Sequence, residues 1–290
     1  MNLISKVSSE LAKVGKSISI TNKLLKEIES REVVPNDDFR VSIPDLNFQK
    51  YLIEDYNLVF IDGTVAYGAI KEITKIDINS YERNFQYLIE SLEGVQYFTD
   101  LTVLDCSLNK LISLDVSKNS ALTYLECYSN QLTTLDVSKN ISLSFLNCGL
   151  NRLTSLDLAK NNALNSLSCY SNQLTSLNVS KNISLTFLSC GDNQLATLDV
   201  SQNSALTLLQ CYANQLISLD VSQNSALTSL NCFTNGLTSM NVSKNKDLTF
   251  LNCENNQLKA LDISGNPLLK TVRLKGNPEH WWKELEKEKE

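Results

Sequence analysis

The sequence predicts a repeat solenoid, a fold built from stacked coils rather than around one globular core. The first observation is a 21-residue unit that recurs without insertion or deletion across residues 101–277, in eight full copies and a partial ninth. The second is that the apolar residues hold fixed places in the unit, so each copy buries its apolar side against its neighbours. The third is a cysteine at the same place in every full copy. We therefore expect a weakly curved, mostly β solenoid with short turns on its convex side.

The chain before the repeats divides into two parts. Residues 1–38 combine apolar residues at helical spacing with a Pro-Asn-Asp-Asp stretch, which predicts an amphipathic helix followed by a linker. We expect this helix to pack on the solenoid or on another copy, and the alternative is a docking helix for a partner. Residues 39–100 are predicted to form an N-terminal cap with degenerate repeats, in which Asp45 caps a short helix over residues 46–54. Within this cap, residues 73–78 repeat the LxxLDV half of the unit and residues 92–98 resemble a degenerate coil.

The repeat itself reads LxxLxCxxNxLxxLDVSxNxx. Its leucines, its cysteine and its valine are predicted to point inward and form the core. Two asparagines per coil, such as Asn109 and Asn119, fall where the chain turns, and their amides can bond backbone groups there in stacked ladders. The two halves of the unit are near-copies, which predicts strand-like conformation on both long sides and weak curvature.

The eight cysteines are 21 residues apart and occupy an inward position, so we interpret them as a buried column of free thiols. Neighbouring thiols lie close, but parallel Cβ directions disfavour a disulfide. No nucleophile or metal site is expected, because the single histidine, His280, lies outside the array. The column consists of Cys106, Cys127, Cys148, Cys169, Cys190, Cys211, Cys232 and Cys253.

A second column places aspartates one coil apart, with lysines three residues further on that can offset their repulsion. We interpret it as a solvated charged face, and the alternative is a cation site. Its acidic members are Asp115, Asp136, Asp157, Asp199, Asp220 and Asp262, interrupted by Asn178 and Asn241.

Aromatic residues gather at the outward positions of the first half of the unit, where packing inside the solenoid does not require them. A large exposed aromatic patch on a soluble protein usually marks an interaction surface. The alternative is that the aromatics only fit strand propensity and stack between coils. The predicted partner-binding residues are Tyr124, Phe145, Phe187 and Phe250 in one row, and Tyr128, Tyr170, Tyr212 and Phe233 in a second. A polar row runs between them, from Asp105 and Glu126 to Asn252.

Residues 278–290 are predicted to form a C-terminal capping helix, with Asn277 as its cap and Pro278 at its first position. One or both of Trp281 and Trp282 are expected to cover the last coil.

The composition argues against several classes of function. A formal net charge of −6 argues against nucleic acid and favours a basic protein partner. No apolar run is long enough to span a membrane, and the first residues make a poor secretory signal, so we expect a cytoplasmic protein. No acid, base and nucleophile converge at a repeat-breaking site, so we expect neither an enzyme nor a cofactor.

With cysteine in the strand and LDVSxN in the second half, the template resembles the 21-residue leucine-rich repeats of bacterial internalin-type proteins, including those with a cysteine ladder. The resemblance covers residues 101–277. It implies protein binding, often adhesion to host or neighbouring cells. We therefore predict a non-enzymatic protein–protein interaction module, in concrete form an inhibitor or immunity protein. The alternative is a bacterial cell-surface or secreted adhesin of internalin-like type.

Overall fold

The computed structural model describes residues 36–79, 88–278, 281 and 287–288, and Arg40–Glu290 belong to one compact unit. Of residues 1–38 only 36–38, in the predicted linker, are described, so the predicted amphipathic helix lies outside the described residues. His280 and Trp282 lie outside them as well.

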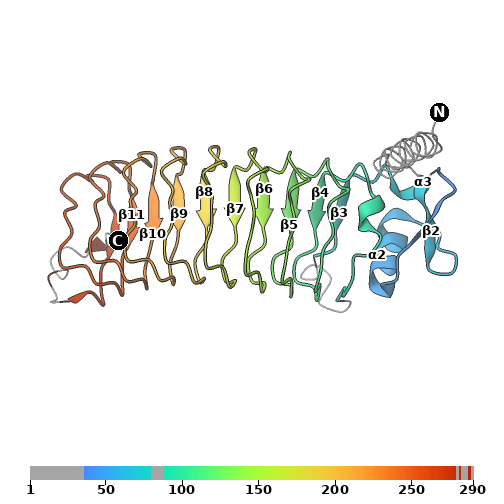
Figure 1. Cartoon of the computed structure of the whole chain (residues 1–290), viewed down its shortest axis with the longest axis horizontal. Helices are drawn as coiled ribbons and strands as arrows, with labels where there is room; N and C mark the ends of the chain where they lie inside the picture. Colours follow the sequence, from blue (N-terminus) through green and yellow to red (C-terminus); the bar gives the residue numbers. More distant parts are fainter. Residues whose placement is uncertain (1–35, 80–87, 279–280, 282–286, 289–290) are drawn as a thin grey trace, which may run out of the picture. The chain divides into compact units, whose positions relative to one another are not determined.

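An 11-stranded sheet runs the length of the solenoid (Figure 1). Ten of its strands pair in parallel, in sequence order and without a change of register, because every coil contributes one strand at the same repeat position. The strands are β3 (Lys75–Asp77), β4 (Val103–Asp105), β5 (Tyr124–Glu126), β6 (Phe145–Asn147), β7 (Ser166–Ser168), β8 (Phe187–Ser189), β9 (Leu208–Gln210), β10 (Ser229–Asn231), β11 (Phe250–Asn252), β12 (Thr271–Arg273) and the antiparallel β13 (Lys287–Glu288).

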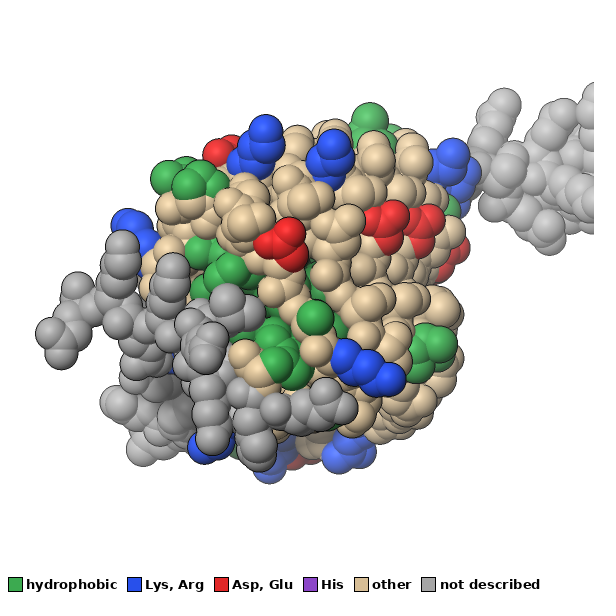
Figure 2. All heavy atoms as spheres, turned by 90° about the vertical axis from the view of Figure 1, so that its left-hand side faces the viewer, with side chains coloured by type: hydrophobic (Ala, Val, Ile, Leu, Met, Phe, Trp, Pro, Cys, Tyr) green, Lys and Arg blue, Asp and Glu red, His purple; other side chains and the backbone are tan. Residues whose placement is uncertain are grey.

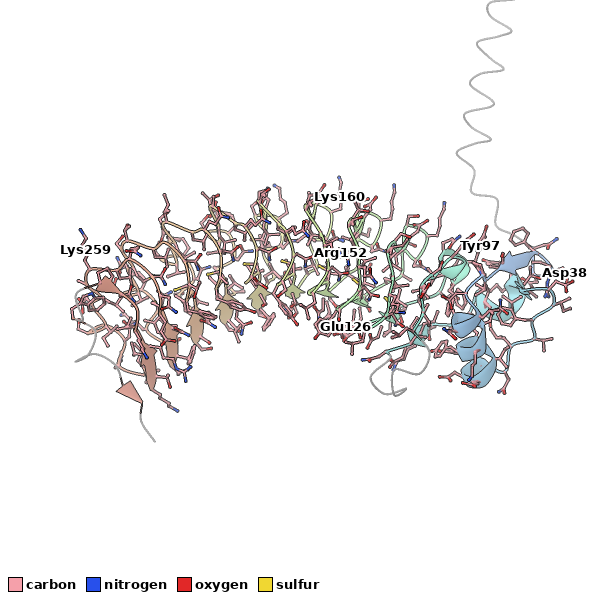
Figure 3. The ribbon with its side chains drawn as sticks, turned by 90° about the horizontal axis from the view of Figure 1, so that it is seen from below. Asp38, Tyr97, Glu126, Arg152, Lys160 and Lys259 are labelled. Carbon is pink, nitrogen blue, oxygen red and sulfur yellow. The ribbon has the colours of Figure 1, made fainter. Side chains whose placement is uncertain are left out.

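Only the first half of each unit forms a strand, so the prediction of two strand-like sides is wrong for the second half. In that half several backbone groups bond to side chains instead of to the backbone of the next coil. The amide of Ser117 donates to Asp115 Oδ1, and the carbonyl of Val116 accepts from the side chain of Asn140. Too few backbone groups therefore remain for a second ladder. The array bends gently with its strands on the inner side, as expected for a weakly curved solenoid (Figure 3).

The core consists of the predicted leucine, valine and cysteine columns, and all eight cysteines are buried free thiols. Both asparagine columns are structural, as predicted. Asn130 Nδ2 donates to the carbonyls of Cys106 and Cys127, at 3.0 and 3.1 Å, while its Oδ1 accepts from the amide of Leu111 at 2.9 Å. In the second column, Asn140 Nδ2 donates to two carbonyls of the preceding coil. Each ladder thus ties neighbouring coils together through buried hydrogen bonds.

The N-terminal cap contains an antiparallel strand pair, two α-helices and one 3-10 helix. They are β1 (Arg40–Ser42), α2 (Leu46–Tyr56), β2 (Thr64–Ala66), α3 (Tyr67–Ile70) and η1 (Val95–Tyr97). Phe48 of α2 packs against Phe98, with ring centroids 6.2 Å apart. Residues 73–78 adopt the strand half of the unit rather than the LxxLDV half, because Ile76 pairs with Leu104. The sequence-based assignment was wrong here because the two halves of the unit are near-copies, and residues 73–78 match both.

Two tyrosines of α2 protect the first edge of the long sheet. The hydroxyl of Tyr51 accepts from the amide of Asp77 at 3.0 Å, and the hydroxyl of Tyr56 donates to the carbonyl of Lys75. These are backbone groups of β3, the strand at the N-terminal end of the sheet. An exposed strand edge is a template for unwanted pairing. The cap therefore blocks edge-to-edge association with side-chain hydrogen bonds.

The C-terminal end differs from the prediction. Pro278 and Trp281 have 3-10 geometry, and Lys287 and Glu288 form β13 on β12, so the predicted helix does not extend through residue 290. Trp281 does help to cover the last coil, since its Nε1 donates to the carbonyl of Leu258 at 3.0 Å. Figure 2 shows this end of the solenoid, with one group of apolar side chains near its centre and others at its rim.

Asp45 is the helix cap that the sequence predicts, and it also joins two segments. One carboxylate oxygen accepts from the amides of Asn47 and Phe48, and the other from Glu90 and Ser91, at 2.8–3.0 Å. We expect Asp45→Ala to destabilise the cap by about 2–3 kcal/mol, because four amides lose their acceptor. Asp45→Asn should cost less, since its single oxygen can keep the helix cap. Hydrogen exchange of α2 measures the difference, and equal protection in both variants would argue against this role.

Candidate functional site

The eight predicted partner-binding residues all lie half-buried on one surface, which we call the strand face: the outward-pointing side chains of β3–β12 and of the residues just after each strand. Tyr124, Phe145, Phe187 and Phe250 begin the strands β5, β6, β8 and β11. The second row, from Tyr128 to Phe233, lies two residues beyond the strand ends. The strands set these positions because alternate side chains point to opposite sides of a sheet.

The structure brings six of the eight rings together in pairs. Tyr124 stacks on Phe145, with centroids 4.3 Å apart and planes within 4°. Tyr212 stacks on Phe233 at 5.0 Å, and Tyr128 approaches Tyr170 at 6.2 Å. Phe187 and Phe250 are separated from the other rings because Ser166, Leu208, Ser229 and Thr271 occupy their row on the adjacent strands.

Two glycines make room for the second row of rings. A Cβ atom at Gly149 would lie 2.6 Å from the ring of Tyr170, and one at Gly191 would lie 2.5 Å from the ring of Tyr212. Each ring therefore leans over the glycine of the preceding coil. Any larger residue at either glycine would displace a ring of the strand face, so these glycines are part of its construction.

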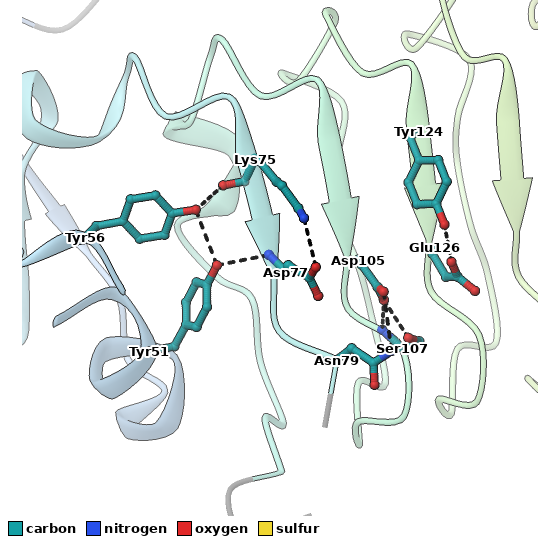
Figure 4. A network of polar contacts seen from close by, with 9 residues as sticks. All are labelled: Tyr51, Tyr56, Lys75, Asp77, Asn79, Asp105, Ser107, Tyr124 and Glu126. Atoms are coloured by element: carbon teal, nitrogen blue, oxygen red, sulfur yellow. Dashed lines mark hydrogen bonds and ion pairs between the residues drawn. The ribbon is translucent and has the colours of Figure 1, made fainter. Parts of the chain in front are cut away.

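The two carboxylates of the polar row, Asp105 and Glu126, lie on β4 and β5, beside Asp77 and Lys75 of β3 (Figure 4). Glu126 accepts from the hydroxyl of Tyr124 and, at 3.0 Å, from the amide side chain of Asn147. Burial raises the pKa of Asp105, and the nearby carboxylates of Glu126 and Asp77 add to the increase. Burial likewise raises the pKa of the Tyr124 hydroxyl. Sequence reasoning missed Asp77 and Lys75, because residues 73–78 were assigned to the other half of the unit.

The aspartate column has a structural role that the sequence did not reveal. The Oδ1 of Asp136, Asp199 and Asp220 each accepts from the amide of the serine two residues later, at 2.8–2.9 Å, and these bonds lower the pKa of each carboxyl group. Asn178 and Asn241 make the same bond. An amide oxygen can accept this hydrogen bond as a carboxylate can, which explains the two interruptions.

A shallow recess lies beside this column, lined by Thr134, Leu135, Asp136, Ser138, Ser155 and Asp157. Within the part of the chain that the structure describes, no group of three or more His, Cys, Asp or Glu side chains could hold a metal ion. No described helix is long and apolar enough to cross a membrane.

Comparison with known proteins gives structural likenesses only. No family model matches the chain, and no curated protein sequence is similar to it. A leucine-rich-repeat protein of Leptospira interrogans is 26% identical with a TM-score of 0.58, over 63% of this chain and 51% of that one. Internalin C2 of Listeria monocytogenes is 19% identical with a TM-score of 0.62, over 81% of this chain and 97% of that one. The functional domain of InlJ from the same bacterium, described as including a cysteine ladder, is 26% identical with a TM-score of 0.43, over 83% and 72%.

The repeat and the fold lead to the same assignment. Coils of 21 residues stack in register through a parallel sheet, and a column of buried free cysteines runs through them. The Leptospira protein and internalin C2 share this solenoid architecture. The chain therefore folds as a leucine-rich-repeat solenoid, similar to the Leptospira protein and to internalin C2.

Proposed function

We propose that this protein is a non-enzymatic binding module that holds a protein partner on its strand face. Leucine-rich-repeat solenoids act in protein–protein interaction, and their curvature gives them extended concave binding surfaces. The single observation that carries the proposal is the aromatic composition of the inner side of the bend. Half-buried rings on a rigid sheet lose little conformational freedom on binding, and such rings are enriched in interfaces.

The concrete form that we propose is an inhibitor or immunity protein, in which a rigid acidic solenoid covers a toxin or enzyme. The net charge of −6 and the aromatic strand face support it. The second candidate is a cell-surface or secreted adhesin, favoured by the internalin-like fold. Fractionation of the source cells separates the two, because an inhibitor of an intracellular enzyme must be recovered with the cytoplasm.

The test of the strand face is capture of a partner from source-cell lysate by the tagged full chain and two variants. The first variant replaces Tyr128, Tyr170 and Tyr212 with alanine. The control replaces Ile112, Ile141 and Ile183, which are exposed by 67%, 62% and 61% and lie outside the strand face. We expect a partner that the native chain and the isoleucine control retain and that the tyrosine variant loses. A partner that all three proteins retain would place binding on another surface.

A further inference from the structure

One coil breaks the repeat at the residue that follows the asparagine column of Asn130. In the seven other full coils this residue is Lys, Gln or Arg, but in the coil of residues 227–247 it is Gly236. Asn235 and Gly236 form the single Asn-Gly pair in the sequence. Gly236 has no positive φ, and a Cβ atom there would meet its nearest neighbour, the carbonyl oxygen of Leu216, at an ordinary 3.5 Å. The fold therefore does not require glycine at this position, and its effect is on the chemistry of Asn235.

An asparagine that precedes glycine is prone to spontaneous deamidation. The backbone nitrogen of the glycine attacks the Cγ of the asparagine, the Cγ–Nδ2 bond breaks, and ammonia leaves with the proton of the attacking amide. Water then opens the resulting succinimide ring at either of its two carbonyl groups, which gives aspartate or isoaspartate. A side chain on the attacking residue hinders ring closure, and glycine has none. The Lys, Gln or Arg of the other coils therefore slows this reaction, whereas Gly236 does not.

Hydrogen bonds of the folded coil hold both reacting groups. Asn235 Nδ2 donates to the carbonyls of Cys211 and Cys232, at 3.0 and 3.1 Å. Its Oδ1 accepts from the amide of Leu216 at 3.1 Å, and the amide of Gly236 donates to the carbonyl of Leu216 at 2.8 Å. Ring closure breaks these bonds, so the reaction proceeds when the coil opens locally. Asn235 is half-buried, whereas most members of its column are buried.

Deamidation removes the donor on which this part of the ladder depends. An ionised carboxylate only accepts hydrogen bonds, so the carbonyls of Cys211 and Cys232 would face a negative charge in place of an amide donor. Buried acceptors without a donor and a charge without a partner are both unfavourable. The carbonyl of Phe233 accepts from the same Nδ2 at 3.4 Å, and the ring of Phe233 stacks on Tyr212. The change therefore reaches one of the ring pairs of the strand face.

We propose that Asn235 is a modification site, at which spontaneous deamidation places a negative charge in the asparagine ladder and loosens the strand face at Tyr212 and Phe233. With time the protein passes from an amide form with an intact ladder to an acid form in which this coil is open. The inference goes beyond the proposed function, since it concerns how long the strand face keeps its shape and holds whatever the partner is.

The test incubates the full native chain at pH 8 and follows each asparagine by peptide mass spectrometry, which detects aspartate and isoaspartate. We expect Asn235 to react at least about 10-fold faster than any other asparagine of its column, equivalent to a barrier lower by about 1.4 kcal/mol. The matched control is G236Q, which restores the commonest residue at this position and for which the structure has room. In G236Q, Asn235 should react as slowly as the other members of the column.

A second pair of variants measures what the charge does. N235D carries it from the start, and we expect this variant to unfold at a lower urea concentration than the native chain and to exchange the amide hydrogens of residues 227–247 faster. N162D adds the same charge at an exposed asparagine outside both ladders and should unfold like the native chain. An Asn235 that reacts no faster than the rest of its column, or equally fast in G236Q, would overturn the inference. Equal stability of N235D and N162D would overturn it as well, because deamidation would then leave the strand face unchanged.

Discussion

Raising the pH above about 9 should unfold the solenoid cooperatively, because the cysteine column cannot ionise while it remains buried. Burial raises the pKa of Cys148 and of Cys190 to about 12, and burial raises those of Cys106, Cys127, Cys169 and Cys211 as well. An unfolded cysteine has a pKa of about 8.5. The stabilisation from neutral thiols is therefore complete below that value and is lost as the pH rises toward the folded pKa.

The effect is large because it repeats in every coil. At pH 10 the thiols of Cys148 and Cys190 each lower the free energy of unfolding by about 2 kcal/mol relative to pH 7. The buried thiols with a raised pKa in other coils add to this loss, which becomes comparable with the typical stability of a folded protein, about 5–15 kcal/mol. Circular dichroism recorded against pH measures the transition, and a thiol reagent at pH 8 tests burial directly.

The control for this prediction is the double variant Cys148→Val and Cys190→Val, which keeps apolar side chains of similar size and removes two ionising groups. Its alkaline transition should move to higher pH than that of the native chain. Rapid reaction of the thiols in the folded protein at pH 8, or an unchanged transition in the double variant, would contradict the account.

Asn161→Ala should destabilise the middle of the solenoid by about 2–5 kcal/mol, since it removes two buried donors at once. Asn161 Nδ2 donates at 2.9 Å to the carbonyls of both Val137 and Asn140, and the residue is fully buried. Alanine cannot replace either bond, so two carbonyls of the preceding coil lose a buried partner. Because each coil contacts only its neighbours, the lesion should let the array open locally.

The adjacent Asn162 gives a matched control for this second prediction, because it is exposed and belongs to neither ladder. Asn162→Ala should change stability by no more than about 0.5 kcal/mol. Urea unfolding, with hydrogen exchange to locate the opening, measures both variants. Equal stability of the two would show that the second asparagine column is dispensable.

The ladders also show how far sequence reasoning reaches. Asn109 and Asn119 could be assigned to the turns from spacing alone, because a fixed period repeats every contact. The backbone conformation of these turns could not be assigned in this way. One residue per coil, such as Leu150 or Thr234, has a positive φ of 50° or 55°. Nothing in these residue types favours that conformation, which costs about 1–2 kcal/mol and which the stacked coils impose.

The candidate site divides in a similar way. The sequence placed all eight aromatic residues on one surface, since strand periodicity settles which side chains point outward. The sequence did not predict which rings pair. Pairing depends on whether the residue at the same position of the preceding coil is small, as Gly149 is beneath Tyr170. The contribution of Asp77 to the same surface also needed the structure, since the assignment of residues 73–78 rested on register with β4.

The sequence by itself determined the solenoid, its coil length, its buried cysteine column and the surface that carries the aromatics, because each of these follows from periodicity. Only the tertiary structure decided which half of the coil becomes the sheet, since that choice depends on whether Asp and Asn side chains take the backbone hydrogen bonds. It also decided how both ends close. At the ends the period stops, and single contacts such as Tyr51 with β3 or β13 with β12 replace the pattern.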